Sequence, residues 1–245
     1  MPDTWSDDLM PSEIQAAESE DVKYPYADKC PVVLLLDTSG SMRGNPIKEL
    51  NEGVKLLIQE LLNDPEAKQR VEVAVITFGG TVKVVQDFKL PEDSNIQDFK
   101  AGGGTPMGEA IERGISLLTE RKRKLREQGI NYYRPWLVLI TDGYPTDMKL
   151  GDSKYRRIKD NLYRQEKEKH LIAWFFGTDS ANFEFLKDLH PGINGRVYQL
   201  RGYRFKEIFK WLSASMSAVS RSQPGQKAGI PNPASISESI LEIPI

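Results

Sequence analysis

The chain has 245 residues, 39% hydrophobic and 28% charged, which is typical of a soluble globular protein with one α/β domain of roughly 200 residues. Its single cysteine, Cys30, excludes an intramolecular disulfide and a cysteine metal cluster, and its net charge of -2 gives no overall attraction to nucleic acid. No stretch approaches the ~18 apolar residues of a membrane span and no signal-peptide pattern opens the chain, so we expect a cytoplasmic protein without membrane contact.

The two ends of the chain differ in composition from the middle. Residues 1–29 are polar and acidic without periodicity, which predicts a flexible N-terminal arm. Residues 222–245 contain several prolines and glycines and finish in an apolar tip, which predicts a linker-like C-terminal tail. The folded domain is therefore expected at residues 30–221.

Strands and helices alternate through this domain. Short apolar runs predict strands at residues 32–36, 71–76, 82–85, 136–140, 171–176 and 196–200. Apolar residues at helical spacing predict helices that begin near residues 45, 107, 153, 183 and 205. Asn45 is the expected N-cap of the first helix, with Pro46 at its first position, and Gly79-Gly80 is the expected turn of a hairpin.

This alternation predicts the fold class. A sheet whose strands are joined by helices is mainly parallel and is covered on both faces, and the hairpin adds one antiparallel edge strand. We therefore expect an α/β, doubly wound, Rossmann-like domain of three layers.

Polar residues with hydroxyl and carboxylate oxygens follow the predicted strands. Asp37, Ser39 and Ser41 alternate directly after the first strand, and an extended loop would point their side chains the same way. Thr105 precedes the helix near residue 107, and Asp142 follows the strand that ends at Ile140. Ligands of parallel sheets bind at the carboxyl ends of the strands, so these three segments are expected to meet at one edge.

These side chains suit a hard metal ion. Two carboxylates and three hydroxyls are donors that Mg²⁺ prefers, with Mn²⁺ and Ca²⁺ as alternatives. Because the hydroxyls leave such an ion electrophilic, we expect one open coordination position for an acidic residue of a protein partner. A second hypothesis fills that position with a carboxylate of the acidic arm, or with Glu238 or Glu242.

Each segment alone has a simpler interpretation. Thr105 before Pro106 is a good helix N-cap, Asp142-Gly143 is an ordinary turn, and the Asp37 segment is a polar loop. The occurrence of all three at predicted strand ends, in this order, favours a common metal site.

The segment 37–41, together with the later threonine and aspartate, resembles the metal-ion-dependent adhesion site of von Willebrand factor A domains. The resemblance covers about residues 30–220 and all five motif positions are filled. It implies that Ser39 and Ser41 bind Mg²⁺ directly, that Thr105 binds it directly or through water, and that Asp37 and Asp142 act through water.

The longer segments around these residues, 35–42, 103–107 and 139–147, are similar to those of an intracellular bacterial branch of that family, the TerY-like proteins associated with tellurium resistance. Those relatives are often encoded beside a phosphatase and a kinase, so the resemblance implies a tellurite or stress-resistance role and such partners. Many of them carry a cysteine-rich zinc module, which the printed sequence lacks.

The sequence leaves two alternative functions. A metal-dependent hydrolase lacks a convincing general base, because only His170 and His190 are present and both are expected in surface or capping positions. The basic run at residues 121–126 is a candidate nucleic-acid surface, although cations are also common near a helix C-terminus. We expect a protein that is not an enzyme and does not bind nucleic acid.

Overall fold

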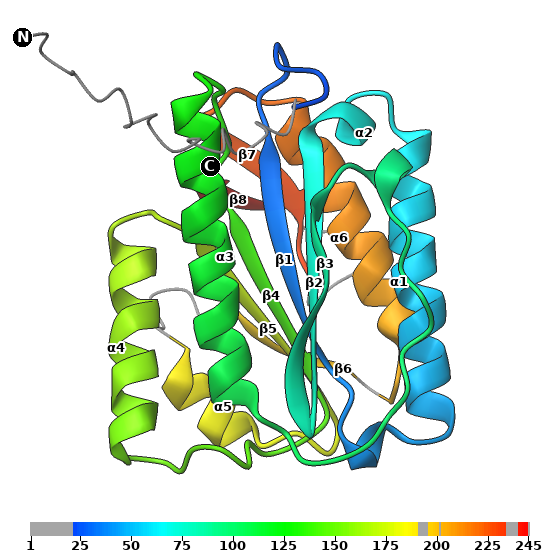
Figure 1. The fold of residues 1–245 in the computed structure, drawn as a ribbon, viewed down its shortest axis with the longest axis vertical. Helices are drawn as coiled ribbons and strands as arrows, with labels where there is room; N and C mark the ends of the chain where they lie inside the picture. The colour runs from blue at the N-terminus through cyan, green and yellow to red at the C-terminus, as the bar shows by residue number, and fades with distance from the viewer. Residues whose placement is uncertain (1–21, 191–195, 201, 234–239, 245) are drawn as a thin grey trace, which may run out of the picture.

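A computed structural model describes residues 22–190, 196–200, 202–233 and 240–244. It has a six-stranded sheet in the order β3-β2-β1-β4-β5-β6 and a separate two-stranded sheet of β7 and β8 (Figure 1). The strands are β1 (Cys30–Asp37), β2 (Val71–Gly79), β3 (Thr81–Lys89), β4 (Trp136–Thr141), β5 (Ile172–Thr178), β6 (Val197–Leu200), β7 (Lys227–Pro231) and β8 (Ile240–Pro244). The helices are η1 (Gly40–Met42), α1 (Asn45–Asn63), α2 (Ala67–Arg70), η2 (Pro91–Asp93), α3 (Met107–Glu127), α4 (Ser153–Lys167), α5 (Phe183–Leu189) and α6 (Phe205–Ser220).

The central strand β1 is buried on both faces, and this explains its continuous apolar sequence. Val32, Leu34 and Leu36 face a core formed with α1 and α6. Val33 and Leu35 face a second core formed with α3, α4 and α5. Figure 1 shows these two helical layers on opposite sides of the sheet.

The predicted fold class is confirmed. β1 pairs in parallel with β2 and β4, while β3 pairs antiparallel with β2 around Gly80, whose φ of 71° suits glycine. One detail of the first helix was wrong, because Gly44 and not Asn45 is the N-cap of α1. Pro46 is therefore the second residue of the helix and not the first; it still lies in the first turn, where its missing N–H needs no partner.

Part of the predicted tail is folded onto the domain. Ala228 and Ile230 of β7 are buried against the α6 side of the core, and the Trp211 indole N–H donates to the Pro231 carbonyl over 2.7 Å. In β7 the buried Ala228 and Ile230 alternate with the exposed Lys227 and Gly229, a strand pattern that the proline and glycine content of the segment obscured.

β8 pairs with β7, opposite Glu242 to Gly229, and lies toward the end of the sheet away from the β1–α1 connection (Figure 1). The strand β8 therefore lies away from the strand ends that carry Asp37 and Asp142. Glu238 and the acidic residues 1–21 lie outside the described part of the chain. Among the described residues, no helix is long and apolar enough to cross a membrane.

Candidate metal centre

Asp37 is the last residue of β1, and its carboxylate is fully buried. One carboxylate oxygen accepts the backbone N–H of Ser39 over 2.8 Å, and the other accepts the hydroxyl of Thr141 over 2.6 Å. Burial raises the pKa of Asp37 from 3.8 to about 6; these hydrogen bonds oppose the shift, and the nearby Asp142 carboxylate adds to it.

The two serine hydroxyls lie side by side, with their oxygens 3.0 Å apart. The expected extended loop was wrong, because Gly40–Met42 forms a short 3₁₀ turn, closed by the Met42 N–H on the Ser39 carbonyl. The turn still brings the hydroxyls together, since it folds Ser41 back toward Ser39. Ser39 is buried and Ser41 is exposed, so the pair runs from the protein interior to the surface.

Asp142 follows β4 directly and is 2% exposed. Its carboxylate accepts the Ser41 hydroxyl over 2.8 Å, a contact between residues 101 positions apart. Burial also raises the pKa of Asp142, against the lowering effect of this hydrogen bond. Within the described ranges, neither Asp37 nor Asp142 has a lysine, arginine or histidine partner within 4.0 Å, so two buried negative charges have no compensating cation.

Thr105 lies beside these carboxylates. Its hydroxyl oxygen and a carboxylate oxygen of Asp37 are both within 4 Å of the point where a side chain on Gly143 would begin. Gly143 therefore leaves open the space between the two groups. The structure thus gathers Asp37, Ser39, Ser41, Thr105 and Asp142 at one edge of the sheet.

The alternative role of Thr105 as a helix cap was wrong. Pro106 occupies the cap position of α3, and the helix N-terminus is instead capped from a distance by Asp147. The carboxylate of Asp147 accepts the N–H groups of Gly108 and Glu109 over 3.1 and 2.9 Å.

The adjacent Thr146 holds the backbone of Thr105 on both sides. Its hydroxyl accepts the Thr105 N–H over 2.9 Å, and its own N–H donates to the Thr105 carbonyl over 2.9 Å. Residues 141, 146 and 147 were not among the predicted site residues. No local signal marks them, because their partners lie about 40 residues or more away in sequence.

Glycines allow the loop before Thr105 to touch both the η1 turn and the β2–β3 hairpin. Gly103 has a φ of 74°, and a Cβ there would come within 2.4 Å of the Gly80 Cα. Backbone bonds then join Gly40 N–H to the Gly103 carbonyl and Gly80 N–H to the Gly104 carbonyl, over 2.9 and 2.7 Å. This close backbone approach fixes the loop that carries Thr105.

The donor set fits a hard divalent cation. Two carboxylates balance a charge of two, and three hydroxyls are oxygen donors of the type Mg²⁺ accepts. Among the described residues, no three His, Cys, Asp or Glu side chains form a metal-binding group. The site therefore differs from zinc centres built on nitrogen and sulfur ligands.

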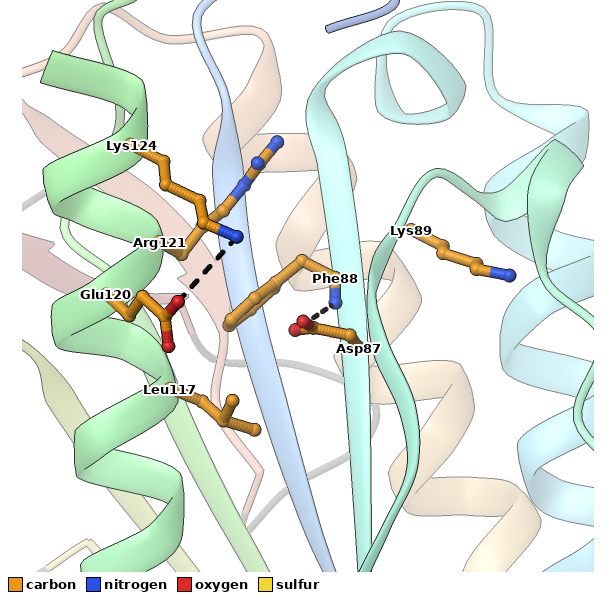
Figure 2. A pocket seen from close by; sticks show the side chains of 7 residues that line it. All are labelled: Asp87, Phe88, Lys89, Leu117, Glu120, Arg121 and Lys124. Atoms are coloured by element: carbon orange, nitrogen blue, oxygen red, sulfur yellow. Dashed lines mark hydrogen bonds and ion pairs between the residues drawn. The ribbon is translucent and has the colours of Figure 1, made fainter. Parts of the chain in front are cut away.

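The basic run on α3 does not form a free cationic stripe. Arg121 makes a two-pronged ion pair with the buried Glu72. Figure 2 shows the neighbouring pair, in which Lys124 faces Glu120 at 3.7 Å. Arg123 pairs with Glu127 over 2.7 Å. These carboxylates neutralise three of the five cations, which weakens the nucleic-acid alternative.

The histidines also lie away from the carboxylates. His190 is buried, with its ring against Phe175 and its Nε2 3.0 Å from the carbonyl of Ala173, near the start of β5. The expected surface role was wrong for His190, although it does follow α5 at the cap position. His170 is exposed and contacts Glu168 over 3.1 Å.

Comparison with known proteins gives a family match. The model of the von Willebrand factor type A domain matches residues 32–211. The inter-alpha-trypsin inhibitor heavy chain H3 of Bos taurus is 24% identical over 69% of this chain, and heavy chain H2 of Mus musculus is 26% identical over 68%. The matched segment spans only 19% and 18% of those two proteins.

Solved structures share the fold. The pilus adhesin SpaC from Lactobacillus rhamnosus GG has a TM-score of 0.61 at 14% identity, covering 79% of this chain and 30% of its own. A von Willebrand factor type A protein from Catenulispora acidiphila has a TM-score of 0.58 at 17% identity, covering 78% and 43%. Proximal thread matrix protein 1 from the mussel byssus, described with a zinc-occupied metal-ion-dependent adhesion site, has a TM-score of 0.52 at 16% identity, covering 78% and 48%.

Proposed function

This chain belongs to the von Willebrand factor type A domain family, and from that premise we propose that it is a metal-dependent protein-interaction module. Ser39, Ser41 and Thr105 would hold a divalent cation, with Asp37 and Asp142 accepting hydrogen bonds behind them. When bound, the cation supplies a Lewis-acidic position for a carboxylate oxygen of a partner's aspartate or glutamate.

One observation carries this proposal: two buried carboxylates stand beside converging hydroxyls and, within the described residues, have no cationic side chain. Burying unpaired charges is costly, so a cation at this point would stabilise the fold. The donor chemistry favours Mg²⁺, with Mn²⁺ and Ca²⁺ as alternatives. The zinc of the mussel protein is compatible with a divalent ion at the corresponding motif.

The arrangement supports binding better than catalysis. Asp37 and Asp142 are committed to hydroxyl and backbone donors, and His170 and His190 make their contacts elsewhere. We propose that the protein is not an enzyme and that it acts in the cytoplasm. The similarity to TerY-like proteins supports a tellurite or stress-resistance role in which the partner is a phosphatase or a kinase.

Metal titration followed by thermal unfolding tests the site. A ligand at 100 times its dissociation constant stabilises a fold by ~2.7 kcal/mol, so Mg²⁺ or Mn²⁺ should raise the melting temperature above that in chelator. The double variant Ser39→Ala/Ser41→Ala should lose this shift. Ser180→Ala is the matched control, because Ser180 also pairs with a hydroxyl, that of Thr178, just beyond a parallel strand of the same sheet.

Partner capture tests the function itself. Partners should be retained in metal and lost both in chelator and in the double serine variant, while Ser180→Ala retains them. Equal melting curves with and without metal at tens of millimolar, or the same captured partners under every condition, would overturn the proposal.

A further inference from the structure

Two cations of the basic run lack the carboxylate partners that neutralise the other three. Lys122 is 7% exposed, and its ammonium donates over 3.1 Å to the carbonyl of His170. Arg126 donates over 3.1 Å to the hydroxyl of Tyr132. Among the described residues neither has an Asp or Glu within 4.0 Å, so both charges are held by neutral oxygens.

Lys122 lies in a hollow of ≈ 260 Å³ between the C-terminal ends of α3 and α4. Tyr132, Arg134, Lys169 and His170 also line it, and none of its described lining residues is acidic. We call this hollow the basic hollow. It lies at the end of the sheet opposite Asp37, because α3 and α4 begin near the candidate metal centre and run away from it (Figure 1).

Donor groups in the basic hollow remain available. An ammonium has three donors and a guanidinium has five. Within the described residues, Lys122 uses one donor, and Arg134 bonds the carbonyls of Leu171 and Glu166, each over 2.8 Å. The Tyr132 hydroxyl accepts from Arg126 and keeps its own proton to donate. The nearby Glu166 carboxylate is engaged by Arg196; it raises the pKa of Arg134 from a distance but, within the described residues, forms no ion pair with it.

Burial has an electrostatic cost here. Desolvation lowers the pKa of Lys122, and Arg126 lowers it further. Desolvation also lowers the pKa of Arg134, with Glu166 opposing this shift and Arg196 adding to it. A bound anion would offset both effects, because an opposite charge favours the protonated forms.

We propose that the basic hollow is an anion site for a phosphate monoester, bound by Lys122, Arg134, Lys169 and the Tyr132 hydroxyl. A tetrahedral dianion matches several convergent donors and forms strong charge-assisted hydrogen bonds with them. A polynucleotide fits less well, because Lys122 is recessed and the outward-facing cations Arg123 and Lys124 are already paired with glutamates.

Binding is tested on the full-length protein in chelator, so that no divalent metal at the proposed centre can capture phosphate. Calorimetry and NMR titrations use inorganic phosphate, phosphoserine, a phosphoserine peptide and a single-stranded oligonucleotide as separate probes. We expect saturable binding of the phosphate monoesters at millimolar concentrations or below. Tighter binding of the peptide than of inorganic phosphate identifies a protein-borne phosphate, and the reverse order identifies a free one.

Two variants and one matched control decide where the anion binds. Lys122→Gln keeps a donor for the His170 carbonyl but removes the charge, and Lys169→Glu reverses a charge on the exposed rim. Each should weaken binding by about tenfold or more, as expected for a charged hydrogen bond. Lys124→Gln, on the same helix but paired with Glu120, should leave affinity unchanged.

Several results would overturn the proposal. One is no binding of any phosphate monoester at millimolar concentrations. Another is an equal loss of phosphate affinity in Lys124→Gln and Lys169→Glu. Lys169→Glu makes this test possible even if Lys122→Gln fails to fold. A third is tighter, strongly salt-dependent binding of the oligonucleotide, which would instead identify a nucleic-acid surface.

Discussion

At the carboxyl end of β1 and β4, Asp37 and Asp142 are buried beside hydroxyls without a cationic side chain among the described residues. At the opposite end, Lys122 and Arg134 are held by carbonyls and form no ion pair with a carboxylate in the part of the chain that the structure describes. Elsewhere, Arg121–Glu72 and Arg196–Glu166 form buried ion pairs, and the buried Lys29 directs its three ammonium donors to the carbonyls of residues 23, 24 and 69. The contrast teaches that buried charge with unused hydrogen-bonding capacity, rather than buried charge itself, distinguishes the candidate ligand sites from groups whose bonds are all made within the fold.

The two ends also differ in how tightly their loops are packed, and two glycines test this. Gly103 at the metal end and Gly129 at the basic end have φ of 74° and 69°, but a Cβ meets Gly80 backbone at 2.4 Å only at Gly103. Gly129→Ala should cost about 1–2 kcal/mol from the left-handed conformation alone. Gly103→Ala should cost more than about 3 kcal/mol and reduce metal affinity, because overpacking adds to that strain. Urea unfolding of both variants measures the difference, and equal costs would contradict the close approach.

The charge imbalance at the metal end predicts a pH dependence. The pKa of Asp37 is raised from 3.8 to about 6, so between these values the folded protein binds more protons than the unfolded one. Stability in chelator should therefore fall as pH rises from about 4 to about 6, with the full penalty present above that range.

Asp37→Asn isolates this effect from other titrating groups. At pH 7 in chelator the variant should be more stable than the wild type by about 1–2 kcal/mol, less than the full shift because the amide cannot accept both hydrogen bonds. The gap should close as pH falls toward 4, and saturating metal should reverse it. Urea unfolding across this range checks the sign, and a constant gap would contradict it.

The support given to Thr105 is expected to have a smaller effect. Thr146→Val keeps the shape of the side chain but removes the acceptor for the Thr105 N–H. The variant should lose about 1 kcal/mol of stability. It should bind metal about tenfold more weakly, as expected when an outer partner of a ligand is removed. Calorimetry of metal binding measures the change, with Ser180→Ala as the unaffected control; wild-type affinity would show that Thr105 does not depend on Thr146.

The smallest effect is expected at the basic hollow in the absence of ligand. Lys122→Gln should leave stability unchanged or raise it by at most about 1 kcal/mol, because it removes a desolvated charge and keeps a donor. Millimolar phosphate should stabilise the wild type more than the variant. Thermal unfolding with and without phosphate checks this, and a large loss of stability in the variant would mean that Lys122 is a purely structural cap.

The sequence predicted the site region better than its geometry. Asp37, Ser39, Ser41, Thr105 and Asp142 were named from residue type and strand order, and the structure brings them together. The extended loop was wrong because the segment closes a 3₁₀ turn. Thr105 as a helix cap was wrong because Asp147 reaches α3 from the loop after β4.

Most of the fold was predictable from local patterns of hydrophobicity, and β7 is the exception. Apolar runs and helical periodicity are local signals, and they located the strands and helices of the main sheet within a few residues. β7 was hidden within a segment rich in proline and glycine. Its burial depends on α6 and on the bond from Trp211 to Pro231, which local composition does not encode.

The sequence by itself determined the order of strands and helices, the α/β class and the presence of hydroxyl and carboxylate groups at strand ends. These follow from short-range patterns of hydrophobicity and from residue chemistry. Only the tertiary structure decided which oxygens meet, such as Ser41 with Asp142, and which cations are neutralised, such as Arg121 by Glu72. These pairings join segments far apart along the chain, so they depend on how the layers pack rather than on any local pattern.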